Sequence, residues 1–232
     1  MKFRSEQGIL VETLGALARI ASTRNAGTPA LSGVKMTLTG DTLVLSSTDN
    51  DVAIQFVVAV GGDTDGQSLV SARTLSEIVR VMPQGKVTLE VAGDVATVSA
   101  GRSHFTIPTL NAVEFPRLTP PDGDPVTIKS TEFKRALGQV VLAASRDPQK
   151  MHLSAVLLTS TPGGLRLVAT DGYRMAMRDL AGAPGEGIDQ FLIPARALSE
   201  LQRLLDMSDE VNVRFSDLET AFQTPSMTLS TR

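Results

Sequence analysis

An internal repeat is the feature of this sequence that most restricts its fold. The segment at residues 165–177, LRLVATDGYRMAM, resembles residues 43–53, and most shared positions differ by 122 residues (165 − 43). Within this match only the alanine pair, Ala53 and Ala176, slips by one residue. Further matches follow in the same order, and the clearest is ARTLSE at residues 72–77 against ARALSE at residues 195–200. A period this long indicates a duplicated domain, because solenoid repeats span about 20–50 residues.

The hydrophobic pattern predicts similar elements in both copies. Apolar residues at helical spacing predict helices at residues 9–20, 72–82, 131–145 and 195–205. Runs rich in β-branched residues predict antiparallel strands between them, and GGDTDG at residues 61–66 predicts a surface turn. The expected fold class is therefore α+β, with two duplicated domains that each pack two helices on antiparallel sheets.

A proline-rich stretch separates the two copies. Residues 117–125, RLTPPDGDP, show no periodicity and are typical of a linker. We expect a first domain at residues 1–117, a linker at 118–125 and a second domain at 126–232. The second copy lacks a counterpart of residues 110–116, so its last strand is expected to be incomplete.

The composition excludes several classes of protein. The chain has no cysteine, which excludes disulfides and thiolate metal sites and suits a reducing compartment. No apolar run approaches the roughly 18–20 residues that span a bilayer, and the first residues lack the apolar core of a signal peptide. We therefore expect a cytoplasmic protein with no membrane partner.

Two of the predicted helices carry an arginine pair opposite their apolar stripe. The pairs are Arg73 with Arg80 and Arg196 with Arg203, each spaced by about two helical turns. They could merely solvate an amphipathic helix, or they could bind the phosphates of a polyanion. The predicted helices and their flanking loops carry more basic than acidic residues, although the net charge of the chain is −3. The basic residues are Arg19, Arg24, Arg73, Arg80, Lys134, Arg135, Arg146, Arg196 and Arg203, and the acidic ones are Glu12, Glu77, Glu132, Asp147, Glu200 and Asp206.

No motif for catalysis or for cofactor binding is present. The sequence contains no phosphate-binding P-loop, dinucleotide fingerprint, zinc-protease motif or nucleophile elbow. We expect no enzyme, no catalytic residue, no cofactor and no metal. Turn chemistry accounts for Asp171 and Gly172. It does not account for the adjacent Tyr173, Arg174 and Met175, a combination of side chains often used to bind partners.

The segment LVATDGYRMAM resembles the ATDGHRLA motif of the bacterial sliding clamp family, the β subunit of the replicative DNA polymerase III. Further similar stretches are MKF at the start, TPALSGV at residues 28–34, RSHFTIPTLNAVEFPRL at 102–118 and IPARALSELQRLLD at 193–206. The resemblance extends over essentially all 232 residues. The chain departs from the family pattern at Tyr173, usually histidine, at Met175, usually leucine, and at Ala30, usually isoleucine. Arg24 lies one place earlier than the loop arginine of the family.

The resemblance implies the DNA-clamp fold and a DNA polymerase processivity factor. Family members have three such domains, and two subunits form a ring whose helices surround double-stranded DNA. The implied partners are this DNA, DNA polymerase III, the clamp loader, clamp-binding-motif peptides and further copies of the chain. The implied DNA-binding residues are Arg24, Arg73, Arg80, Lys150, Met151, His152, Arg196 and Arg203. The implied residues of the peptide pocket are Leu153, Thr170, Gly172, Tyr173, Arg174 and Met175.

The third domain of the family has no counterpart in these 232 residues. In the family it forms one wall of the peptide pocket and one side of the ring interface. The resemblance therefore leaves two interpretations, a fragment of a longer clamp or a two-domain variant that needs three copies to close a ring. The alternative function is a truncated clamp paralogue that binds peptides without encircling DNA.

Overall fold

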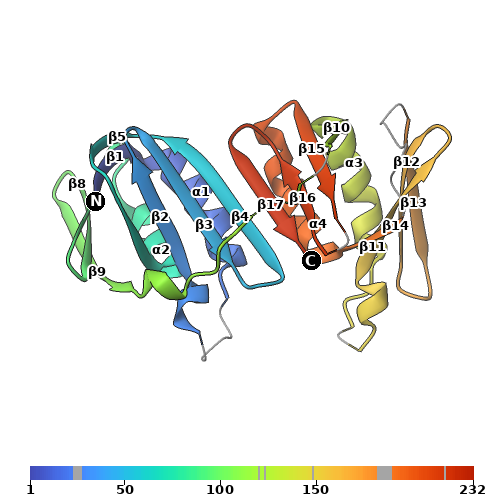
Figure 1. Ribbon diagram of the computed structural model, residues 1–232, viewed down its shortest axis with the longest axis horizontal. Helices are drawn as coiled ribbons and strands as arrows, with labels where there is room; N and C mark the ends of the chain where they lie inside the picture. Colours follow the sequence, from blue (N-terminus) through green and yellow to red (C-terminus); the bar gives the residue numbers. More distant parts are fainter. Residues whose placement is uncertain (23–27, 120, 123, 148, 182–189, 217) are drawn as a thin grey trace. The chain divides into compact units, whose positions relative to one another are not determined.

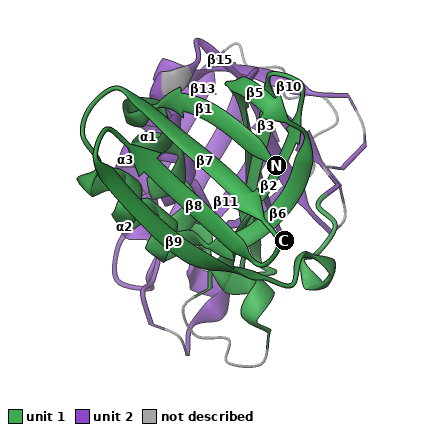
Figure 2. Cartoon of the chain, turned by 90° about the vertical axis from the view of Figure 1, so that its left-hand side faces the viewer, with its two compact units in different colours: residues 1–118 green, residues 119–232 purple. Residues whose placement is uncertain are grey.

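The chain forms two compact units. The computed structural model describes residues 1–22, 28–119, 121–122, 124–147, 149–181, 190–216 and 218–232. Unit 1 comprises Met1–Leu118 and unit 2 comprises Thr119–Arg232, shown in different colours in Figure 2. The α+β fold class with two helices packed on antiparallel sheets in each domain is confirmed.

Unit 1 contains a β-α-β-β-β arrangement twice, with one additional strand between the two occurrences (Figure 1). The first occurrence is β1 (Lys2–Glu6), α1 (Gln7–Ile20), β2 (Gly33–Thr39), β3 (Thr42–Thr48) and β4 (Val52–Ala59), and the additional strand is β5 (Gly61–Thr64). The second is β6 (Gly66–Ser71), α2 (Ala72–Val81), β7 (Lys86–Ala92), β8 (Val95–Ala100) and β9 (Ser103–Leu110). Two 3-10 turns, η1 (Pro29–Ser32) and η2 (Ala112–Glu114), complete the unit. Its strands pair antiparallel in the order β4-β3-β2-β6-β9-β8-β7-β1-β5.

Unit 2 repeats this arrangement without the additional strand. Its elements are β10 (Val126–Lys129), α3 (Ser130–Val140), β11 (Ala155–Thr161), β12 (Gly164–Thr170), β13 (Met175–Ala181), β14 (Gln190–Pro194), α4 (Ala195–Leu204), β15 (Glu210–Phe215), β16 (Thr220–Gln223) and β17 (Met227–Thr231). Its 3-10 turns are η3 (Val141–Ala143), η4 (Met151–Leu153) and η5 (Leu205–Met207). Within the unit the strands pair in the orders β10-β15-β16-β17 and β13-β12-β11-β14.

The element bounds confirm the duplication. Strand β11 is β2 shifted by 122 residues at both ends (155 − 33 and 161 − 39), and β12 is β3 with the same shift. Helix α4 is α2 shifted by 123 at both ends (195 − 72 and 204 − 81). Positions in the two units can therefore be compared residue by residue.

One residue match made from the sequence is wrong. Thr48 pairs with Ala53 in the hairpin of unit 1, and Thr170 pairs with Met175 in the hairpin of unit 2. The counterpart of Ala53 is thus Met175 and not Ala176. Both hairpins have turns of equal length, and turn length fixes the register, so the coincidence of two alanines was misleading.

The apolar stripes of the helices form the core of each unit. Leu10, Leu14, Leu17 and Ile20 of α1 are all buried, as are Leu198, Leu201 and Leu204 of α4. In unit 2, Phe133 of α3 and Phe222 of β16 are fully buried and stack with ring centroids 6.0 Å apart. Their counterparts in unit 1 are the smaller Leu10 (133 − 123) and Val98 (222 − 124), as the helix bounds and strand registers show.

The structure corrects the predicted elements at two places. Residues 61–66 are not a turn, because Gly61–Thr64 forms β5 and pairs with β1. An ion pair of 2.6 Å between Arg4 and Asp63 supports this pairing. The helix predicted at residues 131–145 ends at Val140, and the chain continues as the tighter turn η3. The hydrophobic pattern does not predict β5, because this strand has no apolar alternation.

We expect Phe222→Ala to lower the free energy of unfolding of unit 2 by about 3–5 kcal/mol, because it removes a fully buried ring and leaves a cavity. Leu218→Ala, at an exposed position of the same unit, should change it by less than about 0.5 kcal/mol. Urea denaturation followed by circular dichroism measures both. Equal effects of the two substitutions would contradict the assignment of this core.

Candidate functional site

The two arginine pairs lie on the exposed faces of α2 and α4. Arg73 and Arg80 are exposed on α2, and Arg196 and Arg203 are exposed on α4. Because α4 is α2 shifted by 123 residues, the pairs occupy equivalent positions in their units. The buried residues are Ala72, Leu75 and Val79 in α2, and Ala197, Leu198, Leu201 and Leu204 in α4.

Each arginine pair has a glutamate between its members. On α2 the guanidinium of Arg73 contacts the carboxylate of Glu77 at 2.9 Å. On α4 the equivalent Glu200 contacts Arg203 at 3.1 Å. The Arg73–Glu77 pair is exposed, and exposed ion pairs contribute only about 0–1 kcal/mol. On α2 a phosphate can therefore replace the carboxylate at little cost, and each arginine pair keeps an excess of one positive charge over its glutamate.

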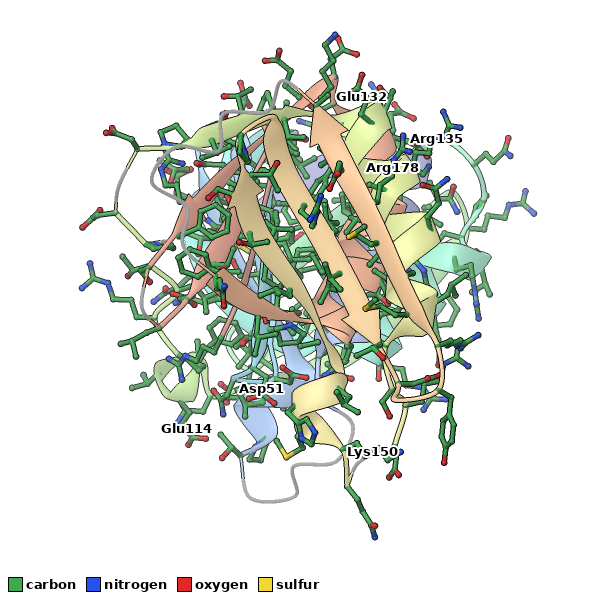
Figure 3. All side chains as sticks on the ribbon, turned by 90° about the vertical axis from the view of Figure 1, so that its right-hand side faces the viewer. Asp51, Glu114, Glu132, Arg135, Lys150 and Arg178 are labelled. Carbon is green, nitrogen blue, oxygen red and sulfur yellow. The ribbon has the colours of Figure 1, made fainter. Side chains whose placement is uncertain are left out.

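The other residues predicted to bind DNA lie in the loop before β11 or outside the described residues. Arg24 is outside the described residues. Lys150 is half-buried immediately before η4, while Met151 and His152 are exposed within η4. Figure 3 shows Lys150 in this loop and Arg135 on α3. The backbone N–H of Ser145 donates to the carbonyl of Leu153 at 2.8 Å, which closes the loop.

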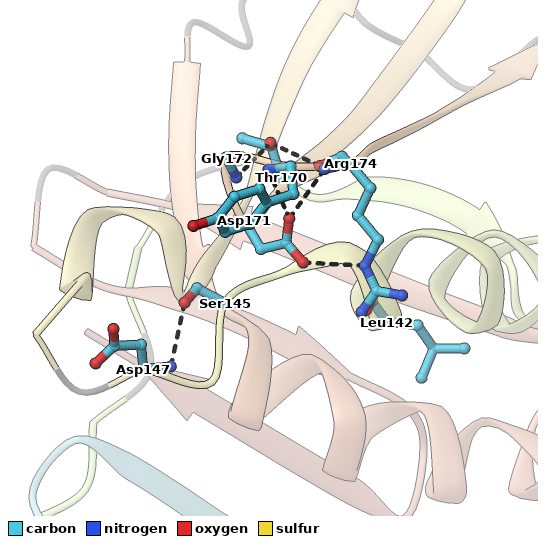
Figure 4. Close-up of polar contacts among 8 residues, drawn as sticks. Leu142, Ser145, Asp147, Thr170, Asp171, Gly172 and Arg174 are labelled. Atoms are coloured by element: carbon cyan, nitrogen blue, oxygen red, sulfur yellow. Dashed lines mark hydrogen bonds and ion pairs between the residues drawn. The ribbon is translucent and has the colours of Figure 1, made fainter.

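The predicted peptide-binding residues come together at the turn between β12 and β13. The hydroxyl of Thr170 donates to the carbonyl of Arg174 at 2.7 Å and accepts from the N–H of Gly172 at 3.1 Å. One carboxylate oxygen of Asp171 accepts from the N–H groups of Tyr173 and Arg174, both at 3.0 Å (Figure 4). Gly172 has φ of +92°, a conformation that glycine adopts without steric cost.

Unit 1 has the same turn at the equivalent position. Thr48 bonds the carbonyl of Val52 and the N–H of Asn50. Asp49 accepts from the N–H groups of Asp51 and Val52, and Asn50 has φ of +80°. The backbone of this turn is therefore a property of the duplicated fold, and only the side chains displayed on it distinguish unit 2.

Unit 2 displays large side chains on this turn where unit 1 has Asp51, Val52 and Ala53. Tyr173 is 92% exposed and Met175 is 70% exposed. The guanidinium of Arg174 contacts the carboxylate of Asp171 at 3.0 Å and donates to the carbonyl of Leu142 at 2.8 Å (Figure 4). A Cβ placed on Gly172 would lie 3.9 Å from Leu153, so η4 adjoins the turn.

Lys150 contacts the predicted peptide site. Its ammonium group lies 5.2 Å from the centroid of the Tyr173 ring, within range of a cation–π interaction. The family resemblance implies that Lys150 binds DNA and that Tyr173 binds peptides. The structure places them side by side, so one loop connects the two predicted sites.

A groove of about 380 Å³, which the sequence does not predict, lies beside this loop in unit 2. Arg146 lines it from the loop and Arg196 from the first turn of α4, with Leu142 and Ser145 on the loop side. The sequence pattern places Arg146 among the basic residues of the predicted helices and their flanking loops and indicates no further role for it. The role of Leu142 as an acceptor for Arg174 depends on its carbonyl group, which a sequence pattern does not indicate.

No group of three or more histidine, cysteine, aspartate or glutamate residues among the described residues could hold a metal ion. No helix in the described part of the chain is long and apolar enough to cross a membrane.

Both units match known protein families. Residues 1–119 match the family model described as DNA polymerase III beta subunit, N-terminal domain. Residues 127–232 match the model described as DNA polymerase III beta subunit, central domain.

Individual relatives agree with these matches. The chain is 31% identical to the beta sliding clamp of Micrococcus luteus over 92% of this chain and 69% of the relative. It is 31% identical to that of Caulobacter vibrioides over 100% of this chain and 65% of the relative. The crystal structure of the DNA polymerase III subunit beta from Pseudomonas aeruginosa superimposes with a TM-score of 0.91 at 30% identity, covering 100% of this chain and 64% of that one.

A sliding clamp structure with a ligand is also similar. The structure from Bartonella birtlesii bound to griselimycin has a TM-score of 0.93 at 27% identity and covers 100% of this chain and 64% of that one. The chain thus spans less than two thirds of the Caulobacter, Pseudomonas and Bartonella proteins and 69% of the Micrococcus protein.

We expect the pKa of Asp171 to lie below the ordinary carboxyl value. The backbone N–H of Tyr173, then that of Arg174, and then the Arg174 guanidinium favour the charged form and lower the pKa. The stabilisation they give is complete above the unfolded pKa of about 3.9 and is lost as the pH falls through the lowered folded value. A carbon-13 NMR titration of the Asp171 carboxyl measures this pKa.

The Arg174→Met variant is the control for this titration. It should leave the pKa of Asp171 below the ordinary value, because the two backbone donors remain. A pKa at or above the ordinary value in the unaltered chain would contradict the turn geometry.

Proposed function

This chain belongs to the DNA polymerase III β subunit family, the sliding clamps, and we propose that it acts as a processivity factor of DNA replication. In this role it encircles duplex DNA, slides along it and tethers DNA polymerase III through a peptide-binding surface. Units 1 and 2 are then the N-terminal and central domains of a clamp. The chain has no catalytic role of its own in this proposal, and it works in the bacterial cytoplasm on DNA delivered by a clamp loader.

The observation that carries the DNA-binding part is the repetition of the arginine pairs at equivalent positions of α2 and α4. Solvation of a single helix does not require the same two cations on a second helix. A phosphate backbone does favour repeated cations, because each contact neutralises one phosphate and releases counterions. Contacts to phosphate carry no sequence information, which suits a protein that must slide. Arg24, Lys150, Met151 and His152 complete the proposed DNA-binding set with these four arginines.

The turn between β12 and β13 supports the peptide-binding part. It presents Tyr173 and Met175 to solvent on a backbone fixed by the side chains of Thr170 and Asp171. The tyrosine ring has few rotatable bonds and loses little entropy on binding, and the flexible methionine side chain adapts its shape to an apolar partner. Leu153, Gly172 and Arg174 complete the proposed surface. Griselimycin, the ligand of the Bartonella birtlesii clamp structure, is a further candidate ligand for this surface.

A second candidate function is a peptide-binding module that does not encircle DNA. The observation that favours it is that the turn, η4 and the carbonyl of Leu142 all belong to unit 2. This surface therefore needs no closed ring of subunits. The two candidates differ in whether DNA topology affects retention.

We expect the protein, loaded on nicked circular plasmid by a clamp loader and ATP, to be released when the plasmid is linearised. A ring that slides runs off free ends, whereas a protein held by local contacts stays bound. Gel filtration of labelled protein with the plasmid, before and after cutting, measures retention. Equal retention on circular and linear plasmid would contradict encirclement and favour the second candidate.

Charge variants test the arginine pairs in the same assay. Arg73→Glu with Arg80→Glu should reduce loading, and so should Arg196→Glu with Arg203→Glu. Arg102→Glu is the control, since Arg102 is exposed in the turn between β8 and β9 and not on a helix. A loading defect in the control as large as in the helix variants would remove the arginine pairs from the proposal.

We expect Met175→Asp to weaken binding of a short hydrophobic peptide of the QLxLF type by about tenfold or more, equivalent to about 1.4 kcal/mol. A buried charge at an apolar anchor is left without a partner, which lowers affinity. Isothermal titration calorimetry measures the dissociation constant. Tyr173→Ala should act in the same direction, while Asp51→Ala, at the equivalent position in unit 1, should have no effect. Unchanged affinity in both unit 2 variants would place the peptide elsewhere.

A further inference from the structure

Lys150 belongs to the proposed DNA-binding set, yet its side chain contacts the proposed peptide-binding surface. Its ammonium group lies 5.2 Å from the centroid of the Tyr173 ring. In the described part of unit 2 this ammonium group forms no ion pair with a carboxylate. Unit 1 has Asp51 at the position of Tyr173, so the duplicated turn does not require the contact. The ring of Tyr173 thus holds a cation that a second ligand can claim.

The backbone around Lys150 is fixed, whereas its side chain can move. The N–H of Lys150 donates to the carbonyl of Asp147 at 3.0 Å, and the N–H of Leu153 donates to the carbonyl of Lys150 at 2.9 Å. Lysine carries its charge on a flexible four-carbon stem. The ammonium group can therefore leave the Tyr173 ring without a change in the backbone of the loop.

The loop that carries Lys150 also borders a groove suited to phosphate. Arg146 of this loop and Arg196 of α4 line the groove of about 380 Å³, and guanidinium groups match phosphate oxygens with planar forks of N–H donors. Because phosphates repeat along a DNA strand, a strand seated here presents further phosphates to the loop. A phosphate offers Lys150 charge-assisted hydrogen bonds, which the Tyr173 ring cannot provide.

A hydrophobic peptide on the turn between β12 and β13 also acts against the contact. Tyr173 is 92% exposed, so the adjoining ammonium group keeps access to water. An apolar side chain packed on the ring would remove this water without giving the charge a new partner, which costs free energy. The peptide therefore binds best when Lys150 has left the ring.

We propose that Lys150 is shared between the two surfaces and couples them. It contacts Tyr173 in the free chain, and a DNA phosphate draws it away, so that a hydrophobic peptide binds more tightly. Both ligands break the same contact, and the second one to bind is spared that cost. The coupling is thus positive and reciprocal, because the peptide must raise the affinity for phosphate by the same factor. It rests on the proposed function, since it joins the two surfaces assigned there.

The strength of the contact sets the size of the coupling. A cation–π interaction at an exposed site contributes about 0.5–1 kcal/mol, which corresponds to a factor of about two to five in affinity. Lys150 acts here as a positioning residue for Tyr173. A purely structural role of Lys150 would not make peptide affinity depend on phosphate.

Intrinsic fluorescence reports on the contact directly, because Tyr173 is the only tyrosine of the chain and there is no tryptophan. Tripolyphosphate serves as the phosphate probe. It should shift the emission intensity of the unaltered chain towards that of Lys150→Met, which has no cation at the ring, and should leave this variant unchanged. Sodium chloride of equal ionic strength is the control for screening. A change no larger than sodium chloride gives would overturn the proposal.

Isothermal titration calorimetry with a peptide of the QLxLF type measures the coupling itself. Tripolyphosphate should lower the dissociation constant of the unaltered chain by about two- to fivefold. Lys150→Met should show the lower constant already, with no further effect of tripolyphosphate. Lys129→Met should behave like the unaltered chain, because Lys129 is exposed on β10, which pairs with β15 and not with the strands of the turn.

A double-stranded oligonucleotide at low salt identifies the source of the phosphate and should act as tripolyphosphate does. An effect of tripolyphosphate that DNA does not reproduce would overturn the role of DNA. Equal peptide affinity with and without both polyanions would overturn the coupling alone, because the peptide still binds. Absence of peptide binding in every condition would instead overturn the proposed peptide-binding function, and the coupling with it. An equal effect in Lys150→Met would remove Lys150 from the coupling.

Discussion

Burial of one apolar stripe per helix is the constraint on which the rest of this structure depends. Each helix must place its leucines against a sheet, because leaving such side chains in water costs about 1.5–3 kcal/mol each. This requirement fixes the rotation of α2 and α4, since Leu75 and Leu198 are both buried. The rotation of the helices then determines where their arginines lie. The residues that must face outward are Arg73, Arg80, Arg196 and Arg203. The basic helix faces are thus a consequence of the cores.

Comparison of the two units distinguishes the residues that the fold requires from the residues that serve a function of one unit. The Thr-Asp turns after β3 and β12 share their hydrogen bonds and a residue with positive φ. A side chain that occurs at this turn in only one unit is therefore not required by the fold. Tyr173 and Met175 are such residues, because unit 1 has Asp51 and Ala53 at their positions. The cation–π contact from Lys150 to Tyr173 further links the loop before β11 to this turn.

Sequence reasoning predicted the features that repeat or that alternate, and failed where contacts connect distant residues. The repeat, the α+β class and the buried stripes followed from spacing alone, as Leu14 and Leu201 show. Strand β5 was not predicted, because Gly61 and Asp63 show no apolar alternation and because its pairing with β1 is a tertiary contact. The proximity of Lys150 to Tyr173 depends on how η4 adjoins the turn.

The stack of Phe133 on Phe222 has a consequence for how the chain reaches its native state. Tandem domains of one topology are prone to exchange elements while they fold, and the shift of 122 or 123 residues makes such exchange geometrically possible. The two cores are nevertheless not interchangeable, because the phenyl rings of unit 2 correspond to Leu10 and Val98 in unit 1. An exchanged helix would either crowd the smaller core or leave a void in the larger one, and both are destabilising. The different core residues of the two units thus favour the packing of each element within its own unit. They disfavour misassembly between the two similar domains.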